Sequence, residues 1–276
     1  MPKLIISRKG FDSGTGGAPN PRVGNQLYAL PIPQAGTGVF YQDLKWDEEN
    51  DYLSQMQQLG ITFYSEAHLD PDLVKGQLSD RLEAWQPAFG QTGAAASHLQ
   101  DQGVGVGDLF LFFSWFREAE RNEKGVLRYR SKAPDQHIFY GYLEVGELIN
   151  LSKQETPEWA HRHPHHVFRD RYDRQGNLLY VSAERSSYWP GLPGAGVFDF
   201  REDRVLTLAG ENRSVWRLPD CLFRKGHCRL SYHEKRQGTA IRGTSGQWRR
   251  LQSVARGQEF VCEMTPRIRE WVSTIL

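Results

Sequence analysis

Runs of apolar and β-branched residues between turn residues predict a protein rich in short strands. The most apolar run, Leu109–Phe113, follows a glycine-punctuated turn at 103–108, and a second clear run is Ile138–Val145. Both carry the aromatic and β-branched residues that favour strands. Shorter runs predict strands at residues 3–7, 27–33, 178–182, 197–200, 205–208, 228–232 and 259–262, with a strand or an extended connection at 61–64. We expect 109–113 to be buried and to end by presenting Ser114 and the residues after it.

Few segments show helical periodicity. Residues 47–59 place Leu53, Met56 and Leu59 at spacings of three, 94–101 fit a short helix, and 266–275 begin with a proline that suits a first helical turn. Many short strands with few helices predict an α+β fold. With no internal repeat and no low-complexity linker, we expect residues 1–276 to form a single domain around a curved or barrel-like mixed β-sheet with a few flanking helices.

Composition narrows the class of protein without identifying it. Hydrophobic residues make up 39% and charged residues 24% of the 276, which is ordinary for a soluble globular protein. No apolar run approaches the ~20 residues that span a bilayer, and three cysteines without a CxxC pair argue against a disulfide framework. We therefore expect a cytoplasmic protein without a membrane partner. Basic residues interleaved with aromatic residues and histidines at 162–185 and 224–256 fit nucleic-acid contacts or a plain solvated surface.

The loop after the first predicted strand gathers charges and glycines. Arg8, Lys9 and Asp12 precede a glycine-rich stretch at 14–17, where backbone amides could approach an anion. The alternative is a charged turn in which Asp12 caps backbone amides. The GxxxxGK[ST] motif is absent, so the loop does not predict nucleotide triphosphate hydrolysis.

His68, Asp70 and Asp72 alternate along the chain. On an extended segment the three side chains would share one face, which suits general acid–base chemistry or a divalent metal. Pro71 disturbs that geometry, and Asp72 could instead cap a helix that begins at Leu73. We take His68 and Asp70, with Asp12, as the candidate catalytic residues.

Histidines are densest at positions 161, 163, 165 and 166. Alternation of His161, His163 and His165 resembles metal-ligand spacing, but there is no nearby cysteine and no HExxH helix. A ligand contact through His163 or His165, a packing role and a metal site all remain open. We assign His165 to ligand binding and predict no metal ligand and no particular cofactor.

Further candidates could bind a flat, polar-edged ligand such as a nucleobase. Trp115 and Phe116 could stack on it while Gln91 and Arg117 bond its edge. Nearer the C-terminus, His233 is a candidate base. Arg256 and Gln258 could contact a base edge or a phosphate, although an ion pair with Glu259 would make Arg256 structural.

Taken together, these segments resemble the nucleotide modification associated domain 3 family. The resemblance extends from residue 3 to about 271 and is carried by residues 7–17, 30–33, 68–73, 89–91, 103–117, 137–147, 163–165 and 256–261. It implies a role in bacterial or phage systems that make or handle hypermodified bases in DNA, with DNA or a modified nucleotide and other proteins of such a system as partners. The positions it implies at the site are Arg8, Lys9, Asp12, His68, Asp70, Gln91, Trp115, Arg117, His165 and Gln258.

A second similarity joins residues 106–113 to residues 137–145. These stretches look like the core of PUA-like domains, including the EVE and ASCH domains, which bind modified bases or RNA in an aromatic-lined pocket. The similarity implies a PUA-like core at about 89–150, interrupted by a charged insertion at 118–136.

Two functions follow from these features. The first is an enzyme that acts on a base in DNA, or on its nucleotide precursor, with His68 and Asp70 as acid and base. The second is a reader that binds a modified base without changing it. A metal-dependent nuclease is disfavoured, because the spacing of acidic residues and histidines matches no familiar nuclease motif.

Overall fold

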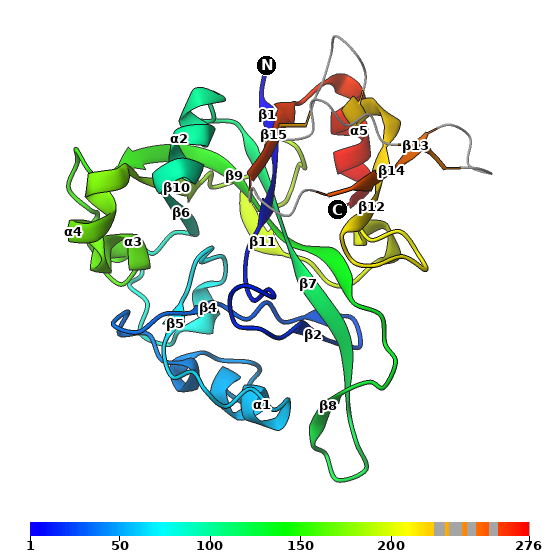
Figure 1. The fold of residues 1–276 in the computed structure, drawn as a ribbon. Helices are drawn as coiled ribbons and strands as arrows, with labels where there is room; N and C mark the ends of the chain where they lie inside the picture. The colour runs from blue at the N-terminus through cyan, green and yellow to red at the C-terminus, as the bar shows by residue number, and fades with distance from the viewer. Residues whose placement is uncertain (224–229, 232–238, 242–246, 254–258, 276) are drawn as a thin grey trace.

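A computed structural model shows an α+β fold built on one large mixed sheet (Figure 1). It describes residues 1–223, 230–231, 239–241, 247–253 and 259–275, and structural statements here concern those residues. The path through the sheet runs β15–β1–β7–β9–β10–β6. These strands are β1 (Lys3–Arg8), β6 (Ala88–Thr92), β7 (Leu109–Arg121), β9 (Gln136–Asn150), β10 (Asn177–Ser182) and β15 (Glu259–Glu263).

Short strands extend the main sheet or form small sheets beside it. Off the main path, β11 pairs with β9, β2 and β8 pair with β7, and β3 pairs with β2. The smaller sheets are β4–β5 and β12–β14–β13. The bounds are β2 (Asn20–Val23), β3 (Gln26–Leu27), β4 (Ile32–Pro33), β5 (Ala67–His68), β8 (Leu127–Tyr129), β11 (Ala195–Val197), β12 (Val215–Pro219), β13 (Thr239–Ala240) and β14 (Trp248–Gln252).

The helices are few and short. The α-helices are α1 (Tyr52–Gln58), α2 (Gly93–Asp101), α3 (Pro164–Val167), α4 (Arg169–Tyr172) and α5 (Pro266–Ile275). Single 3₁₀ turns occur at Tyr41–Asp43, Lys75–Gln77, Glu158–Ala160, Asp173–Gln175, Glu202–Arg204 and Asp220–Phe223. In the described part of the chain, no helix has the length and apolar character needed to cross a membrane.

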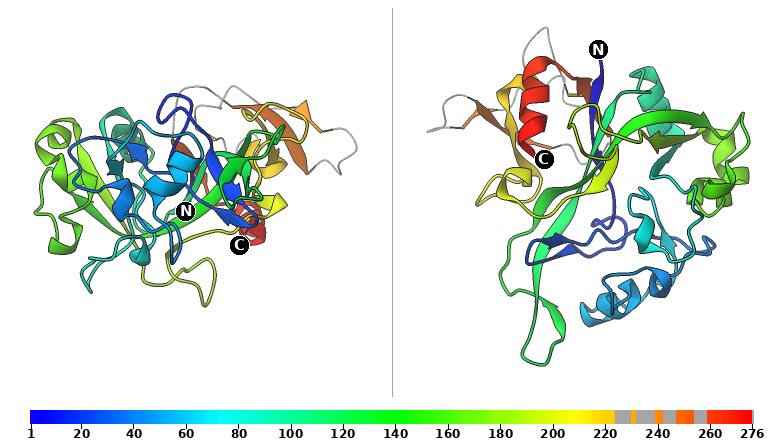
Figure 2. Two further views of the ribbon diagram at one scale, coloured as in Figure 1. Left: turned by 90° about the horizontal axis from the view of Figure 1, so that it is seen from below. Right: turned by 180° about the vertical axis from the view of Figure 1, so that it is seen from behind.

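Both faces of the central strands are buried, which explains their continuous apolar runs. Leu4 and Ile6 point into a core that includes Ile268 and Val272 of α5. The alternate residue Ile5 points into a second core, which includes Leu99 of α2. The sheet therefore lies between α5 on one face and α2 on the other, as the views in Figure 2 also show.

The prediction of a mixed sheet with few helices is confirmed, but the sheet does not close into a barrel. β1 runs parallel to β7 and antiparallel to β15, which makes the sheet mixed. β15 and β6 stand at opposite ends of the strand order and do not pair with each other. The curved sheet is therefore open along the strands that the structure describes.

Strand β7 is longer than predicted. It continues past Phe113 to Arg121, because Asn20–Val23 of β2 pairs alongside its second half and β8 folds back on its end. Ser114 and Trp115 therefore lie within the strand rather than at its exit. The charged stretch 118–136 comprises the end of β7, strand β8 and the start of β9.

Several predicted boundaries were also wrong. The helix expected over 47–59 begins at Tyr52, because Asp51 is its N-cap and accepts a hydrogen bond from the Ser54 amide. The strand expected over 27–33 is divided between β3 and β4, and that at 197–200 lies at 195–197. Of the two alternatives for residues 61–64, the strand is not formed and a connection is left. Residues 205–208 make only isolated bridges, and most of 228–232 is outside the described residues.

Two peripheral units approach each other beside the main sheet. In Figure 1, α3 and α4 occupy the connection between β9 and β10, while the β4–β5 pair lies below them. The β12–β13–β14 sheet and α5 occupy the opposite side of the molecule. The candidate site lies between α3 and the end of β5.

Candidate functional site

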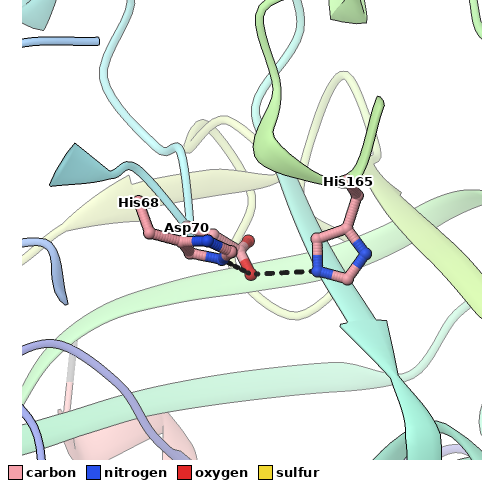
Figure 3. Close-up of side chains that lie close together, drawn as sticks. All are labelled: His68, Asp70 and His165. Carbon is pink, nitrogen blue, oxygen red and sulfur yellow. Dashed lines mark ion pairs between the residues drawn. The ribbon is translucent and has the colours of Figure 1, made fainter. Parts of the chain in front are cut away.

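Among the residues that the structure describes, three histidines surround one buried carboxylate. Oδ2 of Asp70 lies 3.6 Å from Nε2 of His68 and 3.8 Å from Nε2 of His165. Figure 3 shows the carboxylate between the two rings. His163 approaches the other oxygen, with 3.5 Å between its Nε2 and Oδ1 of Asp70. We call His68, Asp70, His163 and His165 the Asp70 cluster.

The end of β5 positions His68 and Asp70. β4 and β5 pair so that Ile32 lies opposite His68, and Gln34, just after β4, places its Oε1 2.7 Å from His68 Nδ1. Two residues beyond Asp70, Asp72 exchanges backbone hydrogen bonds with Ala88 at the start of β6. The Gly90 amide then donates to Asp70 Oδ1 at 2.8 Å. The carboxylate is thus tied to β6 as well as to its own segment.

Helix α3 positions the other two histidines. His163 is its N-cap, and its Nδ1 accepts a hydrogen bond from the His165 amide. Pro164 occupies the first turn, where the missing N–H has no cost. Nδ1 of His165 lies 2.6 Å from Oδ1 of the fully buried Asn177. The local sequence His-Pro-His therefore directs both rings toward Asp70.

The cluster holds a carboxylate ionised although it is buried. Burial alone would raise the pKa of Asp70, but polar contacts with His163 and His68 outweigh it, so the pKa lies well below its ordinary value. Burial lowers the pKa of His165 to about 3, against the opposing effect of Asp70. At neutral pH, the site therefore presents a carboxylate beside an uncharged His165 imidazole.

Asp70 also lines a cavity of about 490 Å³ with aromatic walls. Tyr28, Trp46, Tyr52 and Tyr140 contribute rings to it. The rings of Tyr28 and Trp46 stack with centroids 3.7 Å apart. We call this space the Asp70 cavity. Its volume is in the range of small-molecule sites, and Asp70 is among its lining residues, whereas the histidines of the Asp70 cluster are not.

Another group of predicted residues surrounds a second cavity, of about 530 Å³. Arg8 and Asp12 line it together with His137 and Arg213. Oδ1 of Asp12 accepts hydrogen bonds from the Gly14 and Thr15 amides, as the capping alternative expected. The guanidinium of Arg213 lies 4.0 Å from the centroid of Trp115 and covers that ring.

Other predicted residues make contacts of their own away from the Asp70 cluster. Arg117 makes a two-pronged ion pair with Asp135, and Phe116 is fully buried. Lys9 and Gln91 share a single partner, Glu259, with Nζ of Lys9 2.8 Å and Nε2 of Gln91 2.6 Å from its Oε1.

Not every predicted residue can be placed in a site. Asp72, once considered with His68 and Asp70, is an ion-pair partner of Arg81. His233, Arg256 and Gln258 lie outside the described residues. The structure thus brings together His68, Asp70 and His165 from two separate predicted motifs. The other predicted residues that the structure describes make their contacts elsewhere in the fold.

Sequence reasoning missed the residues that hold the cluster in place. Gly90 has no side chain, and a Cβ atom there would lie 2.2 Å from Cδ2 of His165. The side-chain oxygens of Gln34 and Asn177 contact the Nδ1 atoms of His68 and His165, the ring nitrogens that face away from Asp70. An isolated glycine in a strand can indicate a close approach of another group, but no pattern in the sequence singles out the two amides.

Fold and cluster together define an open-sheet α+β protein with a buried histidine–carboxylate site. The chain belongs to the family described as Nucleotide modification associated domain 3, whose family model matches residues 3–263. This confirms the resemblance found in the sequence and associates the chain with nucleotide modification. No curated protein and no solved structure matches the chain, and the PUA-like core remains a prediction.

Proposed function

We propose that this protein is an enzyme of a DNA base hypermodification system. Its substrate is a modified base in DNA or the nucleotide precursor of that base, and its reaction uses general acid–base chemistry at the Asp70 cluster. The single observation that carries the proposal is the position of Asp70, which belongs both to the histidine cluster and to the wall of an aromatic cavity. Membership in a nucleotide-modification family supplies the substrate class.

The Asp70 cavity suits a nucleobase. Aromatic rings bind a flat heterocycle by stacking whatever its identity, at about 1–3 kcal/mol per base. Tyr28 is half-buried and Trp46 nearly buried, so both are held by the protein before any ligand arrives. Trp115 and Phe116, the platform expected from sequence, are covered or buried, and we therefore transfer the stacking role to the Asp70 cavity.

The cluster suits proton transfer. An ionised carboxylate beside an uncharged imidazole provides a proton acceptor and a neighbouring group that can take up or pass on a proton. His68 completes the set, because its Nε2 faces the same carboxylate oxygen as that of His165. A buried set of this kind, with shifted pKa values, is typical of catalytic sites.

The test is mass spectrometry of nucleosides from native host DNA. Strains carry the parent gene, no gene, Asp70→Asn or the control His161→Gln; His161 lies in the same histidine-rich segment, but its Nε2 contacts the Thr156 carbonyl. We expect a modified nucleoside to disappear or change mass in the deletion and Asp70→Asn strains only. Unchanged nucleosides in the deletion strain would overturn the enzyme proposal.

The alternative is a reader that binds a modified base without altering it. The observation that favours it is the preformed stack of Tyr28 on Trp46, which could hold a base with no chemistry at Asp70. A reader would bind modified DNA more tightly than unmodified DNA and would leave host nucleosides unchanged after deletion. The same mass spectra therefore distinguish the two functions.

A further inference from the structure

The three atoms that face one another in the Asp70 cluster have the spacing of metal ligands. His68, Asp70 and His165 each offer one ligand atom, and these three atoms lie within 4.8 Å of one another; the two histidines face Oδ2 of Asp70 through Nε2. In a tetrahedral zinc site with bonds of about 2.0–2.1 Å, neighbouring ligand atoms are about 3.3–3.4 Å apart. The two distances to Asp70, 3.6 and 3.8 Å, are close to that value. They are also too long for hydrogen bonds, which a charged imidazole and a carboxylate would make at about 2.7–2.9 Å.

The proton on His165 is assigned by its surroundings. Both N–H groups of the Asn177 side-chain amide donate hydrogen bonds, one to the carbonyl of His165 and the other to Oδ1 of Asp173. Its oxygen must therefore be the atom that faces Nδ1 of His165, which consequently carries a hydrogen. In the neutral ring the lone pair is then on Nε2 and faces Asp70.

His68 has a comparable contact with a different amide. Oε1 of Gln34 lies 2.7 Å from Nδ1 of His68, and the Tyr172 hydroxyl contacts the same amide, 3.4 Å from Oε1 and 3.3 Å from Nε2 of Gln34. Metal-ligating histidines almost always donate the other ring N–H to such an acceptor, which fixes the tautomer and orients the ring. Two histidines in the cluster thus have the outer contacts of metal ligands.

The second oxygen of Asp70 has different partners. Oδ1 accepts from the Gly90 amide and faces Nε2 of His163. Nδ1 of His163 accepts a hydrogen bond from the backbone amide of His165, so the neutral ring of His163 carries its hydrogen on Nε2. This Nε2 atom is buried and makes no hydrogen bond to a described residue. Oδ1 is thus held by the Gly90 N–H and faces Nε2 of His163, while Oδ2 faces the Nε2 atoms of His68 and His165.

We propose that the Asp70 cluster binds one divalent transition-metal ion, Zn²⁺ or Fe²⁺, through Nε2 of His68, Oδ2 of Asp70 and Nε2 of His165. Two histidines and one carboxylate form a ligand set that both ions use. Three protein ligands leave coordination positions for water or substrate, which is the mark of a catalytic rather than a structural site. His163 is a positioning residue whose ring faces the other oxygen of Asp70, which accepts from the Gly90 N–H.

This inference names the cofactor of the cluster, and its chemical role rests on the proposed function. His68, Asp70 and His165 would hold the ion, and a Zn²⁺ ion bound there would supply a water whose pKa is lowered to about 7. This water, rather than a free imidazole, would then be the acid–base group. Binding of the ion itself can be measured with no substrate at all.

The experiment measures metal bound by the purified full-length protein. After chelator treatment and loading with Zn²⁺, elemental analysis should find about one ion per chain. Asp70→Asn and His165→Gln should lose more affinity than the roughly 100-fold that removal of an outer contact can cost. The matched controls are His161→Gln and His166→Gln, whose rings stack on each other at 4.4 Å. They should bind like the parent.

A second measurement avoids variants that fail to fold. The parent protein loaded with Co²⁺ should show two strongly shifted, exchangeable proton signals in its NMR spectrum, from the Nδ1–H groups of two coordinated histidines. A parent that retains no Zn²⁺ or Co²⁺ would overturn the inference, as would folded Asp70→Asn protein with parental affinity. Bound metal with unchanged host nucleosides would instead leave the metal site standing and remove the proposed function.

Discussion

The backbone of Gly90 and the imidazole of His165 are in direct contact. A Cβ atom at position 90 would lie 2.2 Å from Cδ2 and 2.4 Å from Cγ of that ring. The same glycine donates its N–H to Oδ1 of Asp70. One residue of β6 therefore sets the position of both a carboxylate and a histidine of the cluster, and it can do so only without a side chain.

Gly90→Ala should displace His165 and weaken metal binding at least tenfold. The added methyl group also overpacks a buried region, which typically costs about 1–3 kcal/mol of stability. Gly105→Ala is the control, because no atom lies within 4 Å of a Cβ at that position. Zinc titration and thermal unfolding of both variants check the prediction. Parental zinc affinity in Gly90→Ala would show that His165 is not a ligand.

Gln34 offers a test of the outer contact to His68. Gln34→Leu removes the acceptor for Nδ1–H and should reduce metal affinity about 10–100-fold. Gln34→Glu keeps an acceptor for both the imidazole and the Tyr172 hydroxyl, and it should retain parental or tighter binding. Isothermal titration with Zn²⁺ distinguishes the two variants. Equal losses in both would mean that packing, rather than the hydrogen bond, explains the effect.

We expect different effects on ligand binding from substitutions of Tyr28, in the Asp70 cavity, and of Trp115, the stacking residue expected from the sequence. Tyr28→Leu should weaken binding of a modified nucleotide by about 1–3 kcal/mol, because Tyr28 lines the Asp70 cavity. Trp115→Leu should leave affinity unchanged, because Arg213 covers that ring. Fluorescence titration with nucleotides from the host's modified DNA measures both. A loss confined to Trp115→Leu would return the ligand to the pocket expected from sequence.

The lowered pKa of buried His137 should make the folded protein less stable as the pH falls below 6.5. Its Nδ1 accepts from the Trp216 indole, and burial, with smaller effects of Arg8 and Arg213, lowers its pKa from 6.5 to about 3. Below pH 6.5 the unfolded chain takes up a proton that the folded protein does not, so stability falls as pH drops from about 6.5 to 3.

His137→Gln removes that titration. Between pH 6 and 4, roughly the window just described, the free energy of unfolding should fall less steeply in the variant, by about 1.4 kcal/mol per pH unit. Urea denaturation at several pH values gives both slopes. Identical slopes would show that His137 takes up its proton in the folded protein.

The sequence was a good guide where burial leaves a simple pattern. β1, β10, β15, α2 and α5 lie where their apolar residues or caps predicted. Trp248–Gln252 was missed, because its arginines hide any alternation and its strand depends on pairing with β12 and β13. The full length of β7 was missed for a related reason, since β2 and β8 pair with its polar half.

The candidate site was predictable in its parts but not in its assembly. His68, Asp70 and His165 each stood out by residue type, yet they belonged to two motifs separated in the sequence by β6, β7, β8 and β9. Only the fold shows that α3 faces the end of β5. Asn177 and Gln34 are ordinary polar residues whose importance comes from the atoms beside them.

The ligands of the proposed ion come from the end of β5, the residues just after it, and α3; in the sequence, several strands of the main sheet lie between these segments. An ion bound there would act as a reversible crosslink between them. Because it would bind the folded arrangement and not the separated segments, loading would raise the free energy of unfolding. Metal supply would then govern how long the protein survives proteolysis, in addition to whether it can react.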